Sequence, residues 1–100
     1  MPLGAAPYLY EPVPGWSSGP DGCEMGVLSG VSVSHDDRIF VVDREPHPGI
    51  LVFDRDGRHI DTWGQDIFPL PHDITLTPDG RAFVADCRDH TVRICSLEGE

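Results

Sequence analysis

Apolar and polar residues alternate along two segments of the chain that lie 43 residues apart. Valines alternate with serines in residues 31–34, and isoleucine and leucine alternate with threonines in residues 74–77. A period of two is typical of a β-strand with one buried face. Short apolar runs of strand length follow at 39–42 and 82–85. The pattern therefore predicts pairs of short strands and no helix.

Turn-forming residues separate these predicted strands. Asp36-Asp37 follows the first alternating segment, and Pro78-Asp79-Gly80 follows the second. Proline presets φ for a turn, whereas aspartate and glycine tolerate a positive φ. Further along the chain the pattern predicts third strands at 50–53 and 91–94, a turn at 54–57 and a polar outer strand at 58–63.

The two segments belong to one internal repeat. One extra residue near Pro48-Gly49 changes the offset from 43 to 42 in the second half of the unit. The aligned pairs are Val31 and Ile74, Val33 and Leu76, Asp36 and Asp79, Arg38 and Arg81, Phe40 and Phe83, Val41 and Val84, Asp43 and Asp86, His47 and His90, Ile50 and Val92, Val52 and Ile94, and Gly57 and Gly99.

Four short antiparallel strands in about 40–45 residues form one blade of a β-propeller. We therefore predict an all-β fold, a partial β-propeller of about one and three-quarter four-stranded antiparallel blades. Residues 1–25 form an N-terminal extension that could supply a ring-closing strand. Residues 26–68 form the first blade with its connecting loop, and residues 69–100 form a second blade without its outer strand.

Charge and cysteine content narrow the classes of partner. The chain carries 17 acidic and 7 basic residues and a net charge of −10, which repels phosphate backbones and anionic lipid. We therefore expect neither nucleic acid nor membrane as a partner. No run approaches the roughly 18 apolar residues of a membrane span, and no signal peptide is evident. Three cysteines without a CxxC pattern predict reduced thiols and a cytoplasmic protein, with a disulfide between Cys87 and Cys95 disfavoured.

Several short motifs resemble those of NHL-repeat propellers. They are residues 41–44 (Val-Val-Asp-Arg), 84–87 (Val-Ala-Asp-Cys), 52–57 (Val-Phe-Asp-Arg-Asp-Gly), 62–64 (Thr-Trp-Gly) and 71–74 (Pro-His-Asp-Ile). The resemblance covers about residues 26–100 and implies a propeller fold. It implies less about function, because propellers serve many functions.

Three other segments resemble the six-bladed peptidyl-α-hydroxyglycine α-amidating lyases, which release glyoxylate from a hydroxyglycine extension. They are residues 43–47, residues 70–72 and the entry segment 8–16. By this resemblance Arg44 is the active-site arginine that binds the substrate carboxylate. His72 is one of three zinc ligands, and the backbone carbonyls of Val31 and Ile74 face a structural calcium ion. The substrate of a complete propeller would be a peptide or a small molecule.

The chain also departs from the lyase pattern. Asp73 follows His72 where those lyases have glycine, and it adds a carboxylate beside the expected site. The family's two other histidine ligands, its catalytic tyrosine and its calcium carboxylate belong to later blades. One histidine does not hold a catalytic zinc ion. We therefore expect no lyase turnover from this chain.

Each candidate residue also has a structural interpretation. Arg44 could pair with the carboxylate of Asp86, and His72 could be a hydrogen-bonded structural histidine. Asp43 and Asp86 are expected to accept hydrogen bonds from backbone N–H groups at turns. Asp86 and Arg93 resemble the structural ion pair within NHL blades. His47 and His90 share one blade position and predict a shared structural role, His35 and His59 are expected at the surface, and Trp63 is expected between blades.

Three functional hypotheses follow. The first is a partial propeller of the lyase-like group, and the second is a non-catalytic NHL scaffold that binds a peptide or protein. The third is an inactive product of a shortened reading frame. An open pair of blades exposes apolar flanks and strand edges, so we also expect marginal stability or self-association through the open blade edges.

Overall fold

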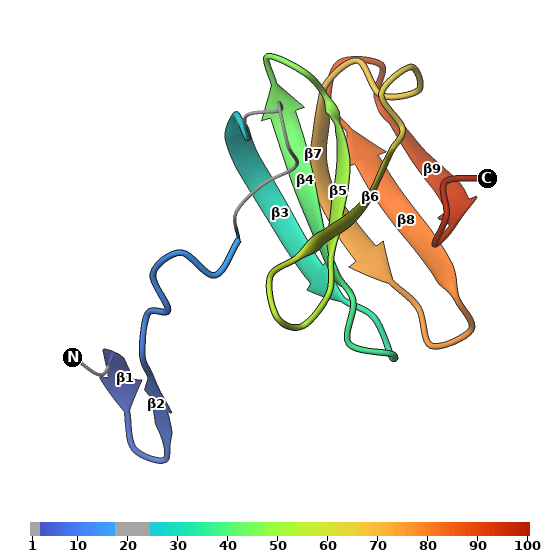
Figure 1. The fold of residues 1–100 in the computed structure, drawn as a ribbon. Helices are drawn as coiled ribbons and strands as arrows, with labels where there is room; N and C mark the ends of the chain where they lie inside the picture. The colour runs from blue at the N-terminus through green and yellow to red at the C-terminus, as the bar shows by residue number, and fades with distance from the viewer. Residues whose placement is uncertain (1–2, 18–24) are drawn as a thin grey trace.

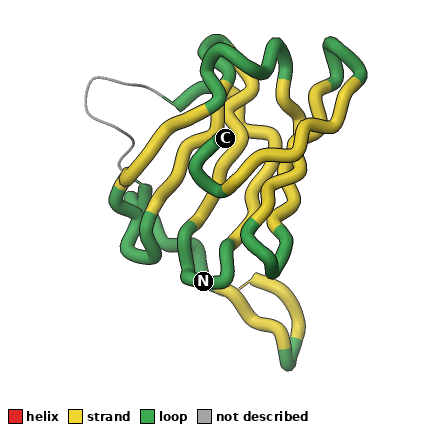
Figure 2. The backbone as a smooth tube through the Cα atoms, turned by 90° about the vertical axis from the view of Figure 1, so that its right-hand side faces the viewer, coloured by secondary structure: helices red, strands yellow, loops and turns green. Residues whose placement is uncertain are grey.

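The computed structural model describes residues 3–17 and 25–100, and these residues form only strands, turns and loops (Figures 1 and 2). Two antiparallel sheets of four and three strands carry the two repeats, and we call them blade 1 and blade 2. Blade 1 consists, in order, of β3 (Val27–Val33), β4 (Ile39–Glu45), β5 (Gly49–Phe53) and β6 (His59–Trp63). Blade 2 consists of β7 (Pro71–Leu76), β8 (Arg81–Asp86) and β9 (Thr91–Ser96). The predicted all-β partial propeller is confirmed.

The two blades pack face to face, and their innermost strands β3 and β7 are in contact. A single apolar core fills the space between them. Because burial of one large apolar side chain contributes about 1.5–3 kcal/mol, this core is the main source of stability between the blades. Its fully buried members are Phe40, Val42, Ile50, Val52 and Trp63 of blade 1, Phe68 of the connecting loop, and Ile74, Ala82, Val84 and Cys95 of blade 2. Trp63 thus lies between the blades, as predicted.

Strand register follows the alternation seen in the sequence. In blade 1, Val31 lies opposite Val41, and in blade 2 Ile74 lies opposite Val84. Residues directly opposite each other in an antiparallel pair project to the same face of the sheet. Cys95 lies opposite Ala82, so it is far from Cys87 along the hairpin, and both thiols are free.

The outer face of blade 1 has a small apolar cluster of its own. Val41, Leu51 and Phe53 are buried there, and Trp16 and Met25 from the N-terminal extension pack against them. The Trp16 indole N–H donates a hydrogen bond to the carbonyl oxygen of Arg55 at 3.0 Å. Part of the N-terminal extension therefore covers this face of blade 1.

The remaining described part of the extension forms a separate hairpin. β1 (Leu3–Ala5) pairs with β2 (Tyr8–Tyr10), and this sheet has no other strand. In Figure 1 the hairpin lies apart from the two blades. Neither of its strands pairs with a strand of a blade. None of the described segments forms a helix with the length and apolar character needed to cross a membrane.

Candidate functional site

Asp86, at the end of β8, organises the loop that follows it. One carboxylate oxygen accepts the backbone N–H groups of Arg88 (2.9 Å) and Asp89 (3.1 Å), and the other accepts that of Leu70 (2.9 Å). The side chain is 3% exposed. Hydrogen bonds from three backbone donors satisfy a buried carboxylate and fix the local backbone. Asp86 therefore holds the connecting loop against the start of the β8–β9 turn.

Asp43 occupies the equivalent position in blade 1 but has fewer partners. Its Oδ2 accepts the backbone N–H of Gly26 at 3.0 Å, whereas its buried Oδ1 has no hydrogen-bond partner among the described residues. By the repeat alignment, Pro46 stands where blade 2 has Asp89. Proline has no N–H, so one of the donors that serves Asp86 is missing around Asp43. Both aspartates accept backbone hydrogen bonds, and Asp86 does so more fully.

The predicted ion pair between Asp86 and Arg93 is wrong. The Arg93 guanidinium contacts the carboxylate of Asp89 at 3.2 Å instead. The reason is that both oxygens of Asp86 are already engaged by backbone N–H groups, whereas Asp89 presents its carboxylate beside the β9 strand. This pair is exposed on the arginine side, so it contributes little to stability.

Arg44 lies at the end of β4 and is half-buried. Its Nε is buried and has no hydrogen-bond partner in the part of the chain that the structure describes. The alternative pairing with Asp86 is not formed, since Arg44 is absent from the ion pairs of the described residues. The accessible part of this guanidinium, which forms no ion pair among the described residues, is suited to an anionic group from outside the chain.

The proposed zinc and calcium positions lie on the two inner strands. His72 is exposed near the start of β7, and Val31 and Ile74 hold equivalent positions on the edge strands β3 and β7. Within residues 3–17 and 25–100, no group of three His, Cys, Asp or Glu side chains is placed to hold a metal ion. The described donor set therefore does not fit a zinc centre, which needs three protein ligands for catalysis.

The other four histidines form no metal-binding group with His72 in the part of the chain that the structure describes. His47 and His90 are both exposed at their shared blade position, and His35 is exposed in the β3–β4 turn. His59 was expected at the surface but is half-buried. Its ring packs edge-on against Phe53 with 5.8 Å between ring centroids, and its Nε2 lies 2.6 Å from the Thr62 hydroxyl. The aromatic contact explains the burial of an otherwise polar side chain.

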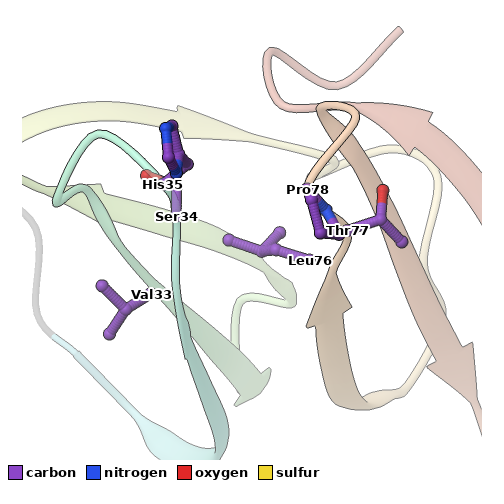
Figure 3. A pocket seen from close by; sticks show the side chains of 6 residues that line it. All are labelled: Val33, Ser34, His35, Leu76, Thr77 and Pro78. Atoms are coloured by element: carbon purple, nitrogen blue, oxygen red, sulfur yellow. The ribbon is translucent and has the colours of Figure 1, made fainter.

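A pocket of about 220 Å³ lies between the blades at the other end of the inner strands (Figure 3). It opens between the β3–β4 turn and the β7–β8 turn, with Leu76, Thr77 and Pro78 on one side and Ser34 and His35 on the other. The residues that line it are Val33, Ser34, His35, Leu76, Thr77 and Pro78. These six residues occupy the same three positions in each repeat, so the pocket forms where two equivalent turns lie next to each other.

Both walls of this pocket are held by the same turn chemistry. The Ser34 hydroxyl accepts the N–H of Arg38 at 3.0 Å and donates to Asp36. The Thr77 hydroxyl repeats the first bond with Arg81 at 3.1 Å. These side-chain hydrogen bonds fix the conformation of both turns, so the residues that line the pocket are held in place.

Hydrogen bonding also tunes the carboxylates of these turns. The Ser34 hydroxyl, with the Arg38 guanidinium, lowers the pKa of Asp36 below its ordinary 3.8. In blade 2 the Thr77 hydroxyl and the Arg81 guanidinium likewise lower the pKa of Asp79. Both aspartates are therefore charged at neutral pH and add negative charge near the pocket.

The sequence pattern indicates Arg44 and His72 as site residues, and it predicts Asp36-Asp37 and Pro78-Asp79-Gly80 only as turns. The pocket was therefore missed. The signal that could have found it is the alignment itself, because equivalent turns at the ends of adjacent inner strands must face each other when blades pack in sequence. His35 is the position where an exposed ring replaces the proline of the other repeat.

Two comparisons with known proteins bear on this fold. Residues 68–95 match the family model of the NHL repeat. The chain is also similar to the WD repeat-containing protein WDS homolog of Arabidopsis thaliana, with 33% identity over 61 residues, which are 61% of this chain and 12% of that protein. WD repeats form the blades of β-propellers. The chain is thus a partial β-propeller that carries an NHL repeat in its second blade.

Proposed function

We propose that this two-blade unit is a non-catalytic scaffold that binds a short peptide segment of a partner protein in the pocket between its inner turns. The observation that carries the proposal is the pocket itself. Leu76 and Pro78 offer apolar surface, and His35 offers a hydrogen-bonding ring at the rim. The polar groups of Ser34, His35 and Thr77 lie beside this apolar surface, and convergent polar groups orient a ligand in its site.

The chemistry of the pocket favours an extended peptide with one apolar side chain. The turns on both walls are locked by their own hydrogen bonds, so a ligand can bind without ordering a loop. The net charge of −10 favours a partner segment with basic residues beside the apolar anchor. The similarity to a protein described by its WD repeats, with no reaction in its name, supports a scaffold as well.

Selection of peptides on the immobilised chain tests this function. A phage-displayed library of random peptides is selected, and enriched sequences are synthesised with a fluorescent label and titrated by fluorescence polarisation. We expect His35→Glu to weaken the selected peptides by about tenfold or more, because it alters the rim of the pocket. The matched control is His47→Glu, since His47 is also exposed but lies at the opposite end of the blade.

Two results would remove the proposal. One is a selection that enriches no peptide on the parent chain. The other is an equal loss of affinity in the His35 and His47 variants, which would indicate non-specific charge effects rather than binding in the pocket.

A second candidate is the amidating-lyase reaction implied by the sequence resemblance. The observation that favours it is that Arg44 is only half-buried and forms no ion pair among the described residues, so its guanidinium suits a substrate carboxylate. His72 alone does not make a zinc centre among the described residues. Calcium at the carbonyls of Val31 and Ile74 remains part of this proposal. We derive no metal-dependent step, and we expect no turnover from this chain alone.

Carboxylate binding at Arg44 can be tested without turnover. An N-acylated α-hydroxyglycine is titrated into the labelled chain while the arginine Nε–H resonances are followed by NMR. We expect a shift at Arg44 that Arg44→Lys abolishes and Arg88→Lys leaves intact. Metal analysis of the purified parent and of His72→Ala tests zinc and calcium separately. No Arg44 shift and no bound metal would remove this candidate.

A further inference from the structure

The interface between the two blades joins one defined face of each repeat. Blade 1 contributes its inner face, which includes Phe40, Ile50 and Val52, and blade 2 contributes a face with Ile74 and Val84. All five side chains are at most 3% exposed. One face of a blade, with side chains from its second and third strands, thus packs against the face of the next blade that carries side chains from its first and second strands.

Each blade carries the other half of this interface on its opposite face. That face is open on blade 2, and on blade 1 it is open along β3, beyond the part that Trp16 and Met25 cover. Val92 and Ile94 of β9 align with Ile50 and Val52, yet they are 62% and 56% exposed. Val31 on β3 aligns with Ile74, and its exposed fraction is 62%. The outer face of blade 2 is therefore equivalent to the inner face of blade 1. The outer face of blade 1 is likewise equivalent to the inner face of blade 2.

These two open faces are complementary, because the chain already joins their counterparts. We propose that the outer face of blade 2 in one copy docks onto the outer face of blade 1 in a second copy, with the geometry of the blade 1–blade 2 interface. The contact is heterologous, because it joins two different surfaces. It continues the blade stack from one chain into the next.

The charges at this interface are complementary as well. Arg38 of blade 1 reaches across to Glu98 beyond β9 with 3.2 Å between Nη1 and Oε2. The equivalent positions on the open faces are Arg81 and Asp56, and both are exposed. Docking a second copy in the same geometry brings these opposite charges together.

A tryptophan and a glycine also recur at both places. A Cβ on Gly99 would lie 2.8 Å from the Trp63 ring, so this tryptophan packs directly on a backbone without a side chain. At the equivalent Gly57, the neighbour is Trp16 of the N-terminal extension, and a Cβ there would clash with its carbonyl oxygen at 1.6 Å. Trp16 thus holds on blade 1 the place that an outer-strand tryptophan of a preceding blade would hold. In the proposed contact Trp16 stays in this place, and the second copy docks on the exposed β3 side of the face.

Sedimentation velocity of the full 100-residue chain over a wide concentration range tests the proposal. We expect the parent to form assemblies larger than dimers as its concentration rises, because a heterologous contact leaves one open face at each end. Val31→Asp and Ile94→Asp should each abolish this association, since each places a charge in an apolar contact. The control is Ile60→Asp, because Ile60 is 48% exposed on β6 and belongs to neither apolar cluster.

Mixing the two disabled variants gives the most specific readout. Val31→Asp retains an intact blade 2 face, and Ile94→Asp retains an intact blade 1 face. The mixture should form a one-to-one dimer and nothing larger. This rescue also shows that both variants are folded, and circular dichroism checks it independently.

The charge pair adds a smaller effect. Arg81→Glu should weaken association by about two- to fivefold, the size expected of an exposed ion pair, and adding Asp56→Arg should restore it. Three outcomes would overturn the proposal: a parent that stays monomeric at every concentration, association unchanged by the two face variants, or a mixture that forms no dimer. Loss in Ile94→Asp alone would indicate symmetric pairing of β9 edges instead.

Discussion

Blade 1 and blade 2 have the same repeat but different surroundings. Phe40 and Phe83 hold the same position, and an arginine lies over each ring, with 5.5 Å and 5.4 Å from Arg38 and Arg81 to the ring centroids. Phe40 is completely buried against blade 2, whereas Phe83 is half-buried on the outer face. The residue type therefore follows the repeat, and burial follows whichever blade lies next to it.

This difference shows that a blade does not bury its apolar side chains by itself. A neighbouring blade must cover its face, which is why repeat proteins gain much of their stability from interfaces between units. In this structure, Trp16 and Met25 cover part of the outer face of blade 1. Blade 2 has no such cover among the described residues, and its β9 side chains Val92 and Ile94 are 62% and 56% exposed.

The largest expected effect comes from truncating the two phenylalanines. Phe40→Ala should destabilise the chain by about 3–5 kcal/mol, the range for a fully buried phenylalanine. Phe83→Ala should cost about 1 kcal/mol, in proportion to its smaller buried area. Urea unfolding followed by circular dichroism at low concentration measures both.

Equal losses in the two variants would contradict the distinction between a covered and an open face. A Phe83→Ala loss that grows with protein concentration would sharpen it, because a second copy covers that ring only when chains associate. The Phe40→Ala loss should be the same at every concentration, since its cover comes from within the chain.

The two aspartates at the strand ends provide the next effect. Asp86→Asn should cost about 1–3 kcal/mol, because asparagine has a single oxygen and turns its amide N–H toward one of the three backbone donors. Asp43→Asn should change stability by less than about 0.5 kcal/mol. Its one oxygen can keep the Gly26 bond, and its amide replaces the unpartnered Oδ1.

Thermal unfolding of the two asparagine variants against the parent provides the measurement. A large loss in Asp43→Asn would mean that Oδ1 has a partner outside residues 3–17 and 25–100. No loss in Asp86→Asn would show that the three backbone bonds contribute little.

The sequence predicted most of this fold because the repeat and the period of two are local signals. Each predicted strand corresponds to an observed one, although the bounds differ by one or more residues. The largest difference is in β3, which begins at Val27, before a register shift near Leu28. Leu28 lies opposite Asp43 at this irregularity, where alternation of apolar and polar residues is lost. Alternation predicts a strand only where it continues, so the sequence gives no signal for the start of β3 beyond this break.

The candidate sites were less predictable, because they depend on contacts between repeats. The alignment placed Asp43 and Asp86 together, but the partner of Arg93 depends on which acceptors the loop backbone has already used. Likewise, the burial of His59 depends on its contact with Phe53. Such choices are made by packing, and a single sequence contains no direct signal for them.

The smallest effect is a dependence on acid pH that compares the two equivalent turns. The pKa of Asp36 is lowered by the Ser34 hydroxyl and Arg38, and the pKa of Asp79 is lowered by the Thr77 hydroxyl and its arginine. A carboxyl with a lowered pKa in the folded state stabilises it above the unfolded pKa, and this contribution is lost as the pH falls through the folded value. Stability should therefore decline below about pH 4.

Unfolding by urea at neutral and acid pH checks this loss in Asp36→Asn and Asp79→Asn. Each variant should lose less stability on acidification than the parent, and Asp36→Asn should show the larger difference. The reason is that the Arg38 side chain is 26% exposed and also contacts Glu98, whereas the Arg81 side chain is 52% exposed. Solvent screens the more exposed pair more strongly. An equal change in both variants would show that the contact between blades does not strengthen the turn of blade 1.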